Sequence, residues 1–546
     1  MPAPSIAPDS VQIPSFKITV RSDVQNLKLN VDTITSIRLA LDTTTLRVRA
    51  ACGGLGTCGA CAIQIISGEC NPPTLAERQK LLPEDLARGV RLACQLRARS
   101  DCELYLEHPA PPSVWKSLDS HSLYQTKKGN ADITEHVYAV AVDLGTTHIR
   151  LSLWNRQSGR RLGTRYGLNP QIADGADVLT RLDAERLDVQ TSRRIGQQAR
   201  TAIMQGIRDI LSRDFGEISP ILSELGRILI VGNTAMLTLI CGDNGDRLYQ
   251  PENWQLPIPC LPDDADEWRR AWHTPHAALD IVQPLAGFIG SDLLADVLAT
   301  GITTSPSPAL LLDFGTNTEI ALWDGQQLWV TSVPGGPAFE GVGMRNGMTA
   351  EAGAICRVSR ENNHWSLQTI DGAPARGFCA SGFIDAVAAL LNAKLLKMSG
   401  RFSNPNMSHA YCLEADNPRS ALFASDIDIF QRAKASTAAA LTQLMTMVGI
   451  TACDLDKLWI CGSLGQQLNL DSACRVGLLP ALSRDRIKLL GNASLAGCEQ
   501  LLIDPDANTR LDTIIAQAKV VNFGGVVDYE TRFIDHLCLK PLPNAE

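Results

Sequence analysis

The stretch VYAVAVDLGTT, residues 137–147, decides the fold of most of the chain. It opens as an apolar run, which is typical of a buried strand, and ends in the polar turn DLGTT at 143–147. Glycine lets the backbone approach a ligand closely, and the amides and hydroxyls of such a turn can donate to phosphate oxygens. An Asp at the end of the strand can hold Mg²⁺ through water.

The same design recurs 170 positions later, where the apolar residues 309–312 run into DFGTN at 313–317. One such turn is also compatible with a plain β-hairpin, but two copies favour a duplicated phosphate site. Residues 427–448 then predict a long alanine-rich helix, and 458–465 predict a strand followed by a glycine loop. The chain contains no G-x-x-x-x-G-K-[ST] motif, which argues against a P-loop ATPase.

A different motif, CGGLGTCGAC, occupies residues 52–61. Its G-x-G-x-x-G pattern is typical of a dinucleotide-binding turn, but that motif needs a helix opening at its third glycine. The β-branched residues Ile63, Ile65 and Ile66 follow instead and predict a strand. The dinucleotide interpretation is therefore disfavoured.

The cysteines of this loop are spaced for an iron–sulfur site. Cys52, Cys58 and Cys61 form a C-x5-C-x2-C pattern, and Cys94 follows after 32 further residues in the setting Leu-Ala-Cys-Gln. Three thiolates on one loop and a fourth from elsewhere suit a [2Fe–2S] cluster. The glycines of the loop let the backbone wrap the cluster and direct amides at the sulfurs.

The chain has 16 cysteines, and its N-terminus lacks the features of a secretion signal. A disulfide framework is therefore not expected, and most of the cysteines are interpreted as small buried hydrophobic residues. Cys70 and Cys102 nevertheless compete with Cys94 for the fourth ligand position. Cys94 is preferred for its separation from the loop and for its local setting.

The sequence around the cysteine loop predicts a small domain. Its expected elements are two alternating strands, a helix capped by Asp32 or Thr33, and a further strand, at 16–20, 27–31, 33–41 and 61–66.

The net charge of −8 argues against nucleic acid or an anionic membrane as a partner. Because no apolar run reaches about 18 residues, no membrane span is expected either, and the protein is expected to be cytoplasmic.

Together these motifs resemble known architectures. The two phosphate turns, the long helix and the glycine loop resemble the actin/hexokinase/Hsp70-type, ribonuclease H-like ATPase. The cysteine loop resembles the β-grasp [2Fe–2S] ferredoxin domain. Over 17–535 the chain resembles the ATP-dependent reductive activators of corrinoid proteins, through GLNPQIADGADVLTRL (167–182), LIVGNTAMLTLI (229–240), PLAGFIGSD (284–292), VPGGPAFEGVGMRNGMTAEAGAI (333–355) and GFCASGFIDAV (377–387).

This resemblance implies a multidomain protein with α/β and α+β parts. The expected parts are a tail, a ferredoxin domain, a linker and two ATPase lobes, at 1–15, 16–108, 109–136, 137–305 and 306–540. Members of the family often carry an extra middle domain between the ferredoxin and ATPase parts. The linker of this chain is too short to hold one.

The resemblance also implies the roles of individual residues. The cluster ligands would be Cys52, Cys58, Cys61 and Cys94. Asp143 and Asp313 would organise Mg²⁺, and Glu340 would orient the attacking water, although a surface or helix-capping role for Glu340 is equally open. Phosphate contacts are expected from Gly145, Thr146, Thr147, Gly315, Thr316 and Asn317, and adenosine contacts from Ser381, Gly382, Gly462 and Gly465.

The implied activity is one-electron reduction of inactive Co(II) to Co(I) in a corrinoid protein, within a methyl-transfer or O-demethylation pathway. The implied cofactors are a [2Fe–2S] cluster, ATP and Mg²⁺. The implied partners are the corrinoid protein and an upstream electron donor, which would be a ferredoxin, a flavodoxin or a reductase. The sequence does not fix the oligomeric state, and a homodimer stays open.

Two other functions compete with this one. The chain could be an ATP-driven electron donor to another low-potential enzyme, as activators of 2-hydroxyacyl-CoA dehydratases are. Those activators lack a ferredoxin domain, so the cysteine loop weighs against this function. A non-enzymatic, redox-sensing actin-like module is the third option, and the presence of both Asp143 and Asp313 argues against it.

Overall fold

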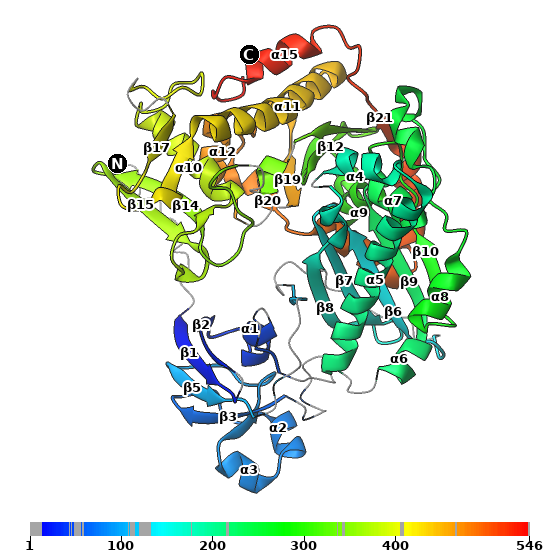
Figure 1. The fold of residues 1–546 in the computed structure, drawn as a ribbon, viewed down its shortest axis with the longest axis vertical. Coiled ribbons are helices and arrows are strands. Elements are labelled where there is room, and N and C mark those ends of the chain that lie inside the picture. The colour runs from blue at the N-terminus through cyan, green and yellow to red at the C-terminus, as the bar shows by residue number, and fades with distance from the viewer. Residues whose placement is uncertain are drawn as a thin grey trace. The chain divides into compact units, whose positions relative to one another are not determined.

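The computed structural model divides into two compact units (Figure 1). The first comprises Met1–Asp119, Arg161–Gly167 and Gly206–Ile221, and the second Ser120–Arg160, Leu168–Gln205 and Leu222–Glu546. The described residues are 14–23, 25–42, 44, 46–48, 56, 59, 61–107, 109, 115–118, 133–175, 177–214, 218–335, 337–340, 344–404, 409–462, 464 and 467–543, with backbone only at 213, 214, 337 and 340. Most of the expected tail and linker therefore lies outside the described residues.

The N-terminal domain of the first unit is built on one mixed sheet. Its elements are β1 (Ser15–Arg21), β2 (Asn26–Asp32), α1 (Ile37–Asp42), β3 (Ala62–Ser67), α2 (Leu75–Lys80), α3 (Pro83–Ala87), β4 (Val90–Leu92) and β5 (Cys102–Tyr105). The strand order is β2-β1-β5-β3-β4, with β1 antiparallel to β2 and parallel to β5. Alternate residues such as Ile18, Val20 and Leu104 point into one apolar core. The predicted hairpin and the β-grasp fold are confirmed.

The first helix is shorter than the sequence predicts. It begins at Ile37, whereas the apolar spacing predicted a start at Thr33. A carboxylate oxygen of Asp32 accepts hydrogen bonds from the amides of Ile34, at 2.8 Å, and Thr35, at 2.6 Å. These bonds hold a local turn at the end of β2, so the helix begins only after this turn.

Two large sheets with related topology follow the N-terminal domain along the chain. The strands of this part of the chain are β6 (Tyr138–Leu144), β7 (His148–Asn155), β8 (Arg160–Leu168), β9 (Leu225–Gly232), β10 (Ala278–Ile281), β11 (Ala309–Phe314), β12 (Asn317–Trp323), β13 (Leu328–Pro334), β14 (Ala354–Glu361), β15 (His364–Thr369), β16 (Gly377–Phe378), β17 (Ala410–Cys412), β18 (Ala421–Phe423), β19 (Lys457–Gly462), β20 (Ile487–Leu489) and β21 (Ala518–Val520). The sheet orders are β10-β9-β6-β7-β8 and β20-β19-β11-β12-β13-β21. In each sheet a central strand, β6 or β11, pairs antiparallel with the next strand and parallel with a distant one. This duplication confirms the two-lobed actin/hexokinase-like fold.

Helices cover these sheets, and α11 lies along the second one (Figure 1). They are α4 (Val178–Glu185), α5 (Val189–Asp214), α6 (Ser219–Ser223), α7 (Thr234–Cys241), α8 (Ala265–Trp272), α9 (Ser291–Thr300), α10 (Ala380–Asn392), α11 (Ala424–Val448), α12 (Leu470–Val476), α13 (Ala493–Ile503), α14 (Ala507–Gln517) and α15 (Tyr529–His536). The long alanine-rich helix predicted at 427–448 is α11, which ends where Gly449 takes a left-handed φ of 74°. Its buried alanines allow close packing against the sheet.

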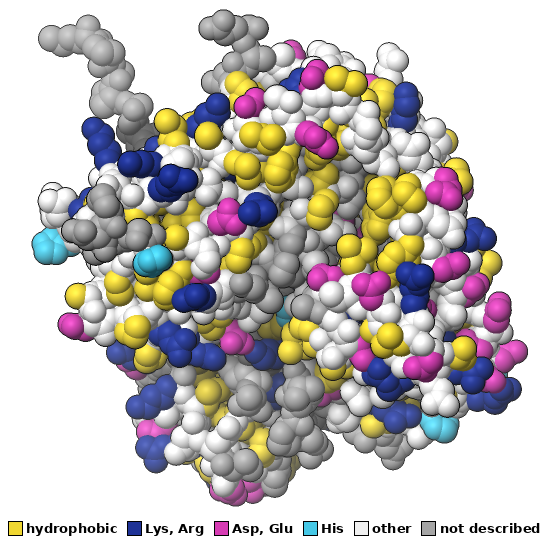
Figure 2. Space-filling model, turned by 45° about the horizontal axis from the view of Figure 1, so that its top comes forward, with side chains coloured by type: hydrophobic (Ala, Val, Ile, Leu, Met, Phe, Trp, Pro, Cys, Tyr) yellow, Lys and Arg dark blue, Asp and Glu magenta, His cyan; other side chains and the backbone are white. Residues whose placement is uncertain are grey.

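The surface mixes charges of both signs. On the face shown in Figure 2, Lys and Arg side chains lie among Asp and Glu, with small hydrophobic patches between them. No helix in the described part of the chain is long and apolar enough to cross a membrane.

Candidate functional site

The first predicted phosphate turn closes the hairpin of β6 and β7. The amide of Gly145 donates to the carbonyl of His148 at 3.0 Å. A side chain at Gly145 would meet that carbonyl at 2.7 Å, so the turn requires glycine. Asp143 is buried opposite Arg150, whose Nη1 lies 3.2 Å from Oδ2 of Asp143. Burial raises the pKa of Asp143 although Arg150 and Asn492 oppose the shift.

The threonines of this turn are buried beside it. The side-chain amide of Asn233, the N-cap residue of α7, donates to Oγ1 of Thr146 at 3.0 Å. The hydroxyl of Thr146 can then donate its own proton to a ligand. The carbonyl of Thr147 accepts from the amide of Asn169 at 2.9 Å. These contacts hold the turn against the residues that directly follow β9 and β8.

The second predicted turn has the same geometry between β11 and β12. The amide of Gly315 donates to the carbonyl of Asn317 at 2.9 Å, and Thr316 is buried. The parallel strand β19 ends beside this turn at Gly462, which has a φ of +72°. A side chain at Gly462 would lie 2.2 Å from Oδ1 of Asp313. The glycine loop predicted from sequence therefore begins next to Asp313.

Three acidic residues that the sequence reasoning missed join the two turns. Asp292 and Asp296 lie one turn apart on α9, and Glu319 lies on β12; with Asp143 and Asp313 they form what we call the carboxylate cluster. Burial and the neighbouring carboxylates raise the pKa of Asp292 to about 8. The same causes raise the pKa values of Asp296 and Glu319 well above their usual range. The only sequence signal was GSD at 290–292, inside a stretch quoted for the family resemblance.

The carboxylate cluster gathers buried acidic groups whose charge a divalent cation would offset. Burial is the first cause of the raised pKa values and repulsion from the neighbouring carboxylates is the second, and a cation would relieve that repulsion. Within the described residues, no three His, Cys, Asp or Glu side chains converge closely enough to hold a metal ion. A Mg²⁺ ion here would complete its coordination with water and phosphate oxygens, as this ion usually does.

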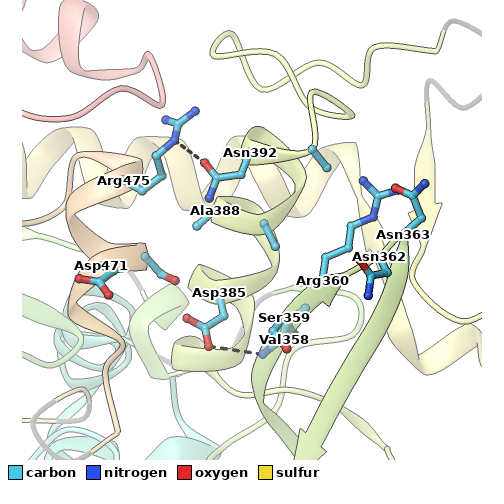
Figure 3. A pocket seen from close by; sticks show the side chains of 13 residues that line it. Val358, Ser359, Arg360, Asn362, Asn363, Asp385, Ala388, Asn392, Asp471 and Arg475 are labelled. Atoms are coloured by element: carbon cyan, nitrogen blue, oxygen red, sulfur yellow. Dashed lines mark hydrogen bonds between the residues drawn. The ribbon is translucent and has the colours of Figure 1, made fainter. Parts of the chain in front are cut away.

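A polar pocket of about 620 Å³ lies between β14, α10 and α12 (Figure 3). At its base Asp385 is 1% exposed, and its Oδ2 accepts from the amide of Val358 at 3.3 Å. Burial raises the pKa of Asp385, and Ser472 is the first of the groups that oppose the shift. Arg360 and Arg475 add positive charge to the wall. The pocket therefore offers a buried acceptor and peripheral donors to a polar ligand.

The structure describes two of the other three residues predicted on the adenosine side, and neither of these two lines the pocket. Ser381 and Gly382, in the first turn of α10, pack against β14; a side chain at Gly382 would lie 1.9 Å from the carbonyl of Ile355. They precede Asp385 by about one turn and do not line the pocket. The side chain of Glu340 and the whole of Gly465 lie outside the described residues.

Two of the four predicted cluster ligands are described, and they lie on adjacent segments. Cys61 directly precedes β3 and Cys94 closely follows β4; both are buried. The amide of Ala93 donates to the carbonyl of Cys61 at 2.9 Å, which holds the segments side by side. Cys52 and Cys58 lie outside the described residues.

The competing cysteines lie at the other end of β3. Cys70 follows that strand and Cys61 precedes it, and six extended residues span roughly 20 Å. The sulfurs of Cys70 and Cys102 lie 3.6 Å apart and contact each other. This geometry favours Cys94 over both as the fourth ligand.

A buried ion pair supports the segment that leads to Cys94. Both carboxylate oxygens of Glu77 accept from Arg91 at 2.8 Å, and Oε1 also accepts from the amide of Leu92 at 3.0 Å. Burial acts to raise the pKa of Glu77, but the bonds from Arg91, Thr74 and Leu92 lower it overall. The ion pair therefore fixes β4 to α2 just before the predicted ligand.

Comparison with known families covers nearly the whole chain. Residues 307–544 match the C-terminal domain of RACo, the ASKHA domain, and 138–305 match the RACo middle region. Residues 20–99 match the 2Fe-2S iron-sulfur cluster binding domain. The chain belongs to the RACo family. Its carboxylate cluster lies across the two RACo regions, and its cysteine loop lies in the iron–sulfur domain. The chain is thus an ATP-dependent iron–sulfur oxidoreductase.

Curated relatives of this RACo-family chain include two corrinoid enzymes. Corrinoid activation enzyme RamQ of Eubacterium limosum is 26% identical over 442 residues, which cover 74% of this chain and 71% of the relative. The [Co(II) methylated amine-specific corrinoid protein] reductase of Methanosarcina barkeri is 26% identical over 417 residues, covering 70% and 73%. A solved reductive activator for corrinoid,iron-sulfur protein shares the fold, with a TM-score of 0.64, 22% identity and coverage of 97% and 99%.

Proposed function

We propose that this chain is a reductive activase that uses ATP to return an inactive corrinoid protein from Co(II) to Co(I), in a methyl-transfer or O-demethylation pathway. The observation that carries the proposal is the fusion of a [2Fe–2S] domain with an ASKHA ATPase in one chain. The names of the two curated relatives, each matched over at least 70% of this chain, support the same substrate class.

The [2Fe–2S] domain and the ATPase are needed together because electron transfer from the cluster to Co(II) is thermodynamically unfavourable. Plant-type [2Fe–2S] centres have potentials of about −400 mV, and reduction of Co(II) to Co(I) requires a lower potential. For a one-electron couple, each ~59 mV of gap costs about 1.4 kcal/mol. A gap of about 240 mV costs about 5.5 kcal/mol by the same relation, which ATP turnover can supply.

The cysteine loop would hold the [2Fe–2S] cluster, which supplies one-electron transfer when bound. Cys52, Cys58, Cys61 and Cys94 are the proposed thiolate ligands. The side-chain amide of Gln95 donates to Sγ of Cys94 at 3.7 Å. Hydrogen bonds to ligand sulfur tune cluster potentials, so Gln95 is placed to affect the potential.

The carboxylate cluster would bind Mg-ATP by its phosphates. Asp143, Asp292 and Asp313 are proposed to hold Mg²⁺ through water, and Glu340 to orient the attacking water. Phosphate oxygens would accept from the two turns, through Gly145, Thr146, Thr147, Gly315, Thr316 and Asn317. The glycines of the loop, Gly462 and Gly465, would pack on adenosine.

The nucleoside would extend from this loop into the polar pocket. Helix α12 follows the loop along the chain and carries Ser472 and Arg475 into the pocket wall. Asp385 supplies a buried acceptor for donor groups of a nucleoside. Ser381 and Gly382 lie in the first turn of α10, and they would support that helix rather than contact the ligand.

The proposed partners are a corrinoid protein and an upstream donor, which would be a ferredoxin, a flavodoxin or a reductase. The proposed location is the cytoplasm, and a homodimer is the proposed alternative to a monomer. The test compares two acceptors under Mg-ATP: a Co(II) corrinoid protein and a 2-hydroxyacyl-CoA dehydratase. Reduction of the corrinoid protein alone supports the proposal, and reduction of the dehydratase alone overturns it.

A further inference from the structure

Two thiols of the N-terminal domain form a pair that the cluster does not use. Sγ of Cys70 and Sγ of Cys102 lie 3.6 Å apart. The thiol of Cys102 is fixed by hydrogen bonds to the carbonyls of Glu69, at 3.3 Å, and Ser100, at 3.2 Å. Cys70 is half-buried, whereas Cys102 is buried.

The backbone around the two thiols enforces this approach. Gly68 has a φ of +95°, and a side chain there would lie 2.7 Å from Sγ of Cys102. Cys70 pairs with Ala98 in an isolated β-bridge, and the amide of Arg99 donates to the carbonyl of Glu69 at 2.8 Å. On the other side of the sulfur contact, Cys102 is held within β5, where it pairs with Ile18. Closing a disulfide requires the two sulfurs to approach from 3.6 Å to about 2 Å.

We propose that Cys70 and Cys102 are a redox-active dithiol that closes to a disulfide when the protein meets a small-molecule disulfide such as oxidised glutathione. One thiolate attacks the oxidant, forms a mixed disulfide and releases one reduced thiol. The second protein thiol then attacks the mixed disulfide, forms the bond between Cys70 and Cys102, and releases the remaining half of the oxidant as a thiol. In total the two cysteines lose two electrons and two protons, and the oxidant becomes two thiols.

The disulfide would enclose the segment between the two cysteines. That segment carries the buried pair of Glu77 and Arg91, and it also carries Cys94. A cross-link restricts the unfolded chain, so the closed form should hold its fourth ligand segment against thermal unfolding. The pair would thus protect the cluster domain under oxidising conditions.

Closure should be slow. Burial, followed by the neighbouring Cys102, raises the pKa of Cys70 to about 12, and Arg91 offsets only a part of this shift. Little thiolate is present at neutral pH, and thiolate is the attacking species. The pair would therefore respond to sustained oxidising conditions.

The experiment uses the full chain with its cluster assembled, incubated without oxygen at increasing ratios of oxidised to reduced glutathione. Mass spectrometry after alkylation should find one peptide linked between Cys70 and Cys102 and lighter by about 2 Da. Heating should then bleach the visible absorbance of the cluster roughly 10 °C higher than in the reduced protein.

Variants make the outcome decisive. Cys70→Ser and Cys102→Ser should keep the cluster absorbance and lose both the linked peptide and the upward shift. Cys412→Ser, a half-buried thiol of the second unit, should behave as the wild type. Absence of the linked peptide at every ratio overturns the proposal. Loss of the cluster in Cys70→Ser also overturns it, because that half-buried thiol would then be a ligand.

Discussion

Glu319 lies directly opposite Asp313, as its register partner across the hairpin of β11 and β12. Both carboxylates belong to the carboxylate cluster, and Oε1 of Glu319 is held at 3.2 Å by the hydroxyl of Ser332. Burial, Asp292 and Asp313 together raise the pKa of Glu319. Two facing carboxylates at the end of the second turn are the basis for proposing a cation at this place.

Replacing Glu319 by Gln should separate stability from cation binding. The amide of Gln can keep a hydrogen bond to Ser332, and the substitution removes one buried acidic group. The free energy of unfolding of the metal-free protein should therefore rise by roughly 1–2 kcal/mol. Stabilisation by Mg-ATP should shrink, because the cation loses one of its negative neighbours. Thermal unfolding with and without Mg-ATP measures both effects.

The exposed Glu361, changed to Gln, is the control and should change neither value. An unchanged Mg-ATP stabilisation in Glu319→Gln would show that this carboxylate does not contribute to the cation site.

Gly462 should be irreplaceable at the start of the glycine loop. In Gly462→Ala the new Cβ would lie 2.2 Å from Oδ1 of Asp313, so Asp313 must move. We expect ATP affinity to fall at least tenfold, measured by equilibrium binding of ATP with Mg²⁺.

Gly449→Ala is a matched control for backbone strain. Gly449 has a nearly identical φ of +74°, but a Cβ added there would meet nothing within 4 Å. Left-handed strain of about 1–2 kcal/mol applies to both variants. Equal losses of ATP affinity in the two would mean that the contact with Asp313 is unimportant.

The architecture was predictable from sequence because its signals are local. Apolar strands that end in Asp-x-Gly-Thr at 143–146 and 313–316 encode the paired hairpins, and alanine-rich periodicity encodes α11. Asp292, Asp296 and Glu319 were missed because only folding brings α9 and β12 to the two turns. The pocket at Asp385 was missed for the same reason, since its wall combines β14, α10 and α12. The start of α1 was misplaced because Asp32 closes a turn that apolar spacing does not reveal.

The ion pair of Glu77 and Arg91 should stabilise the cluster domain. Glu77→Ala leaves Arg91 buried without its carboxylate, which typically costs about 3–5 kcal/mol. We expect the cluster absorbance of Glu77→Ala to bleach at a lower temperature than that of the wild type. Asp85→Ala, which breaks an exposed pair with Arg88, should leave the bleaching temperature unchanged. A similar shift in both variants would contradict a special role for the buried pair.

His536 should make the second unit sensitive to acid. Burial, followed by Lys434, lowers its pKa from 6.5 to about 4, and its Nε2 lies 3.1 Å from the hydroxyl of Thr442. The unfolded chain takes up a proton below pH 6.5 while the folded chain does not, so stability falls as the pH drops from 6.5 toward 4. The loss should reach about 3 kcal/mol.

Urea unfolding followed by tryptophan fluorescence at pH 7.5 and 4.5 measures this loss. His536→Asn should show a smaller difference between the two pH values than the wild type. The exposed His364→Asn should match the wild type. An undiminished difference in His536→Asn would assign the acid sensitivity to other groups.

The central claim is that ATP turnover at the carboxylate cluster drives an electron from the cysteine-loop cluster to cobalt. The most direct test mixes the reduced protein with a Co(II) corrinoid protein and follows Co(I) absorbance with Mg-ATP, with Mg-ADP and without nucleotide. We predict Co(I) only with Mg-ATP, and none with Cys94→Ser or Asp313→Asn. Co(I) formation at the same rate and extent without nucleotide would contradict the claim.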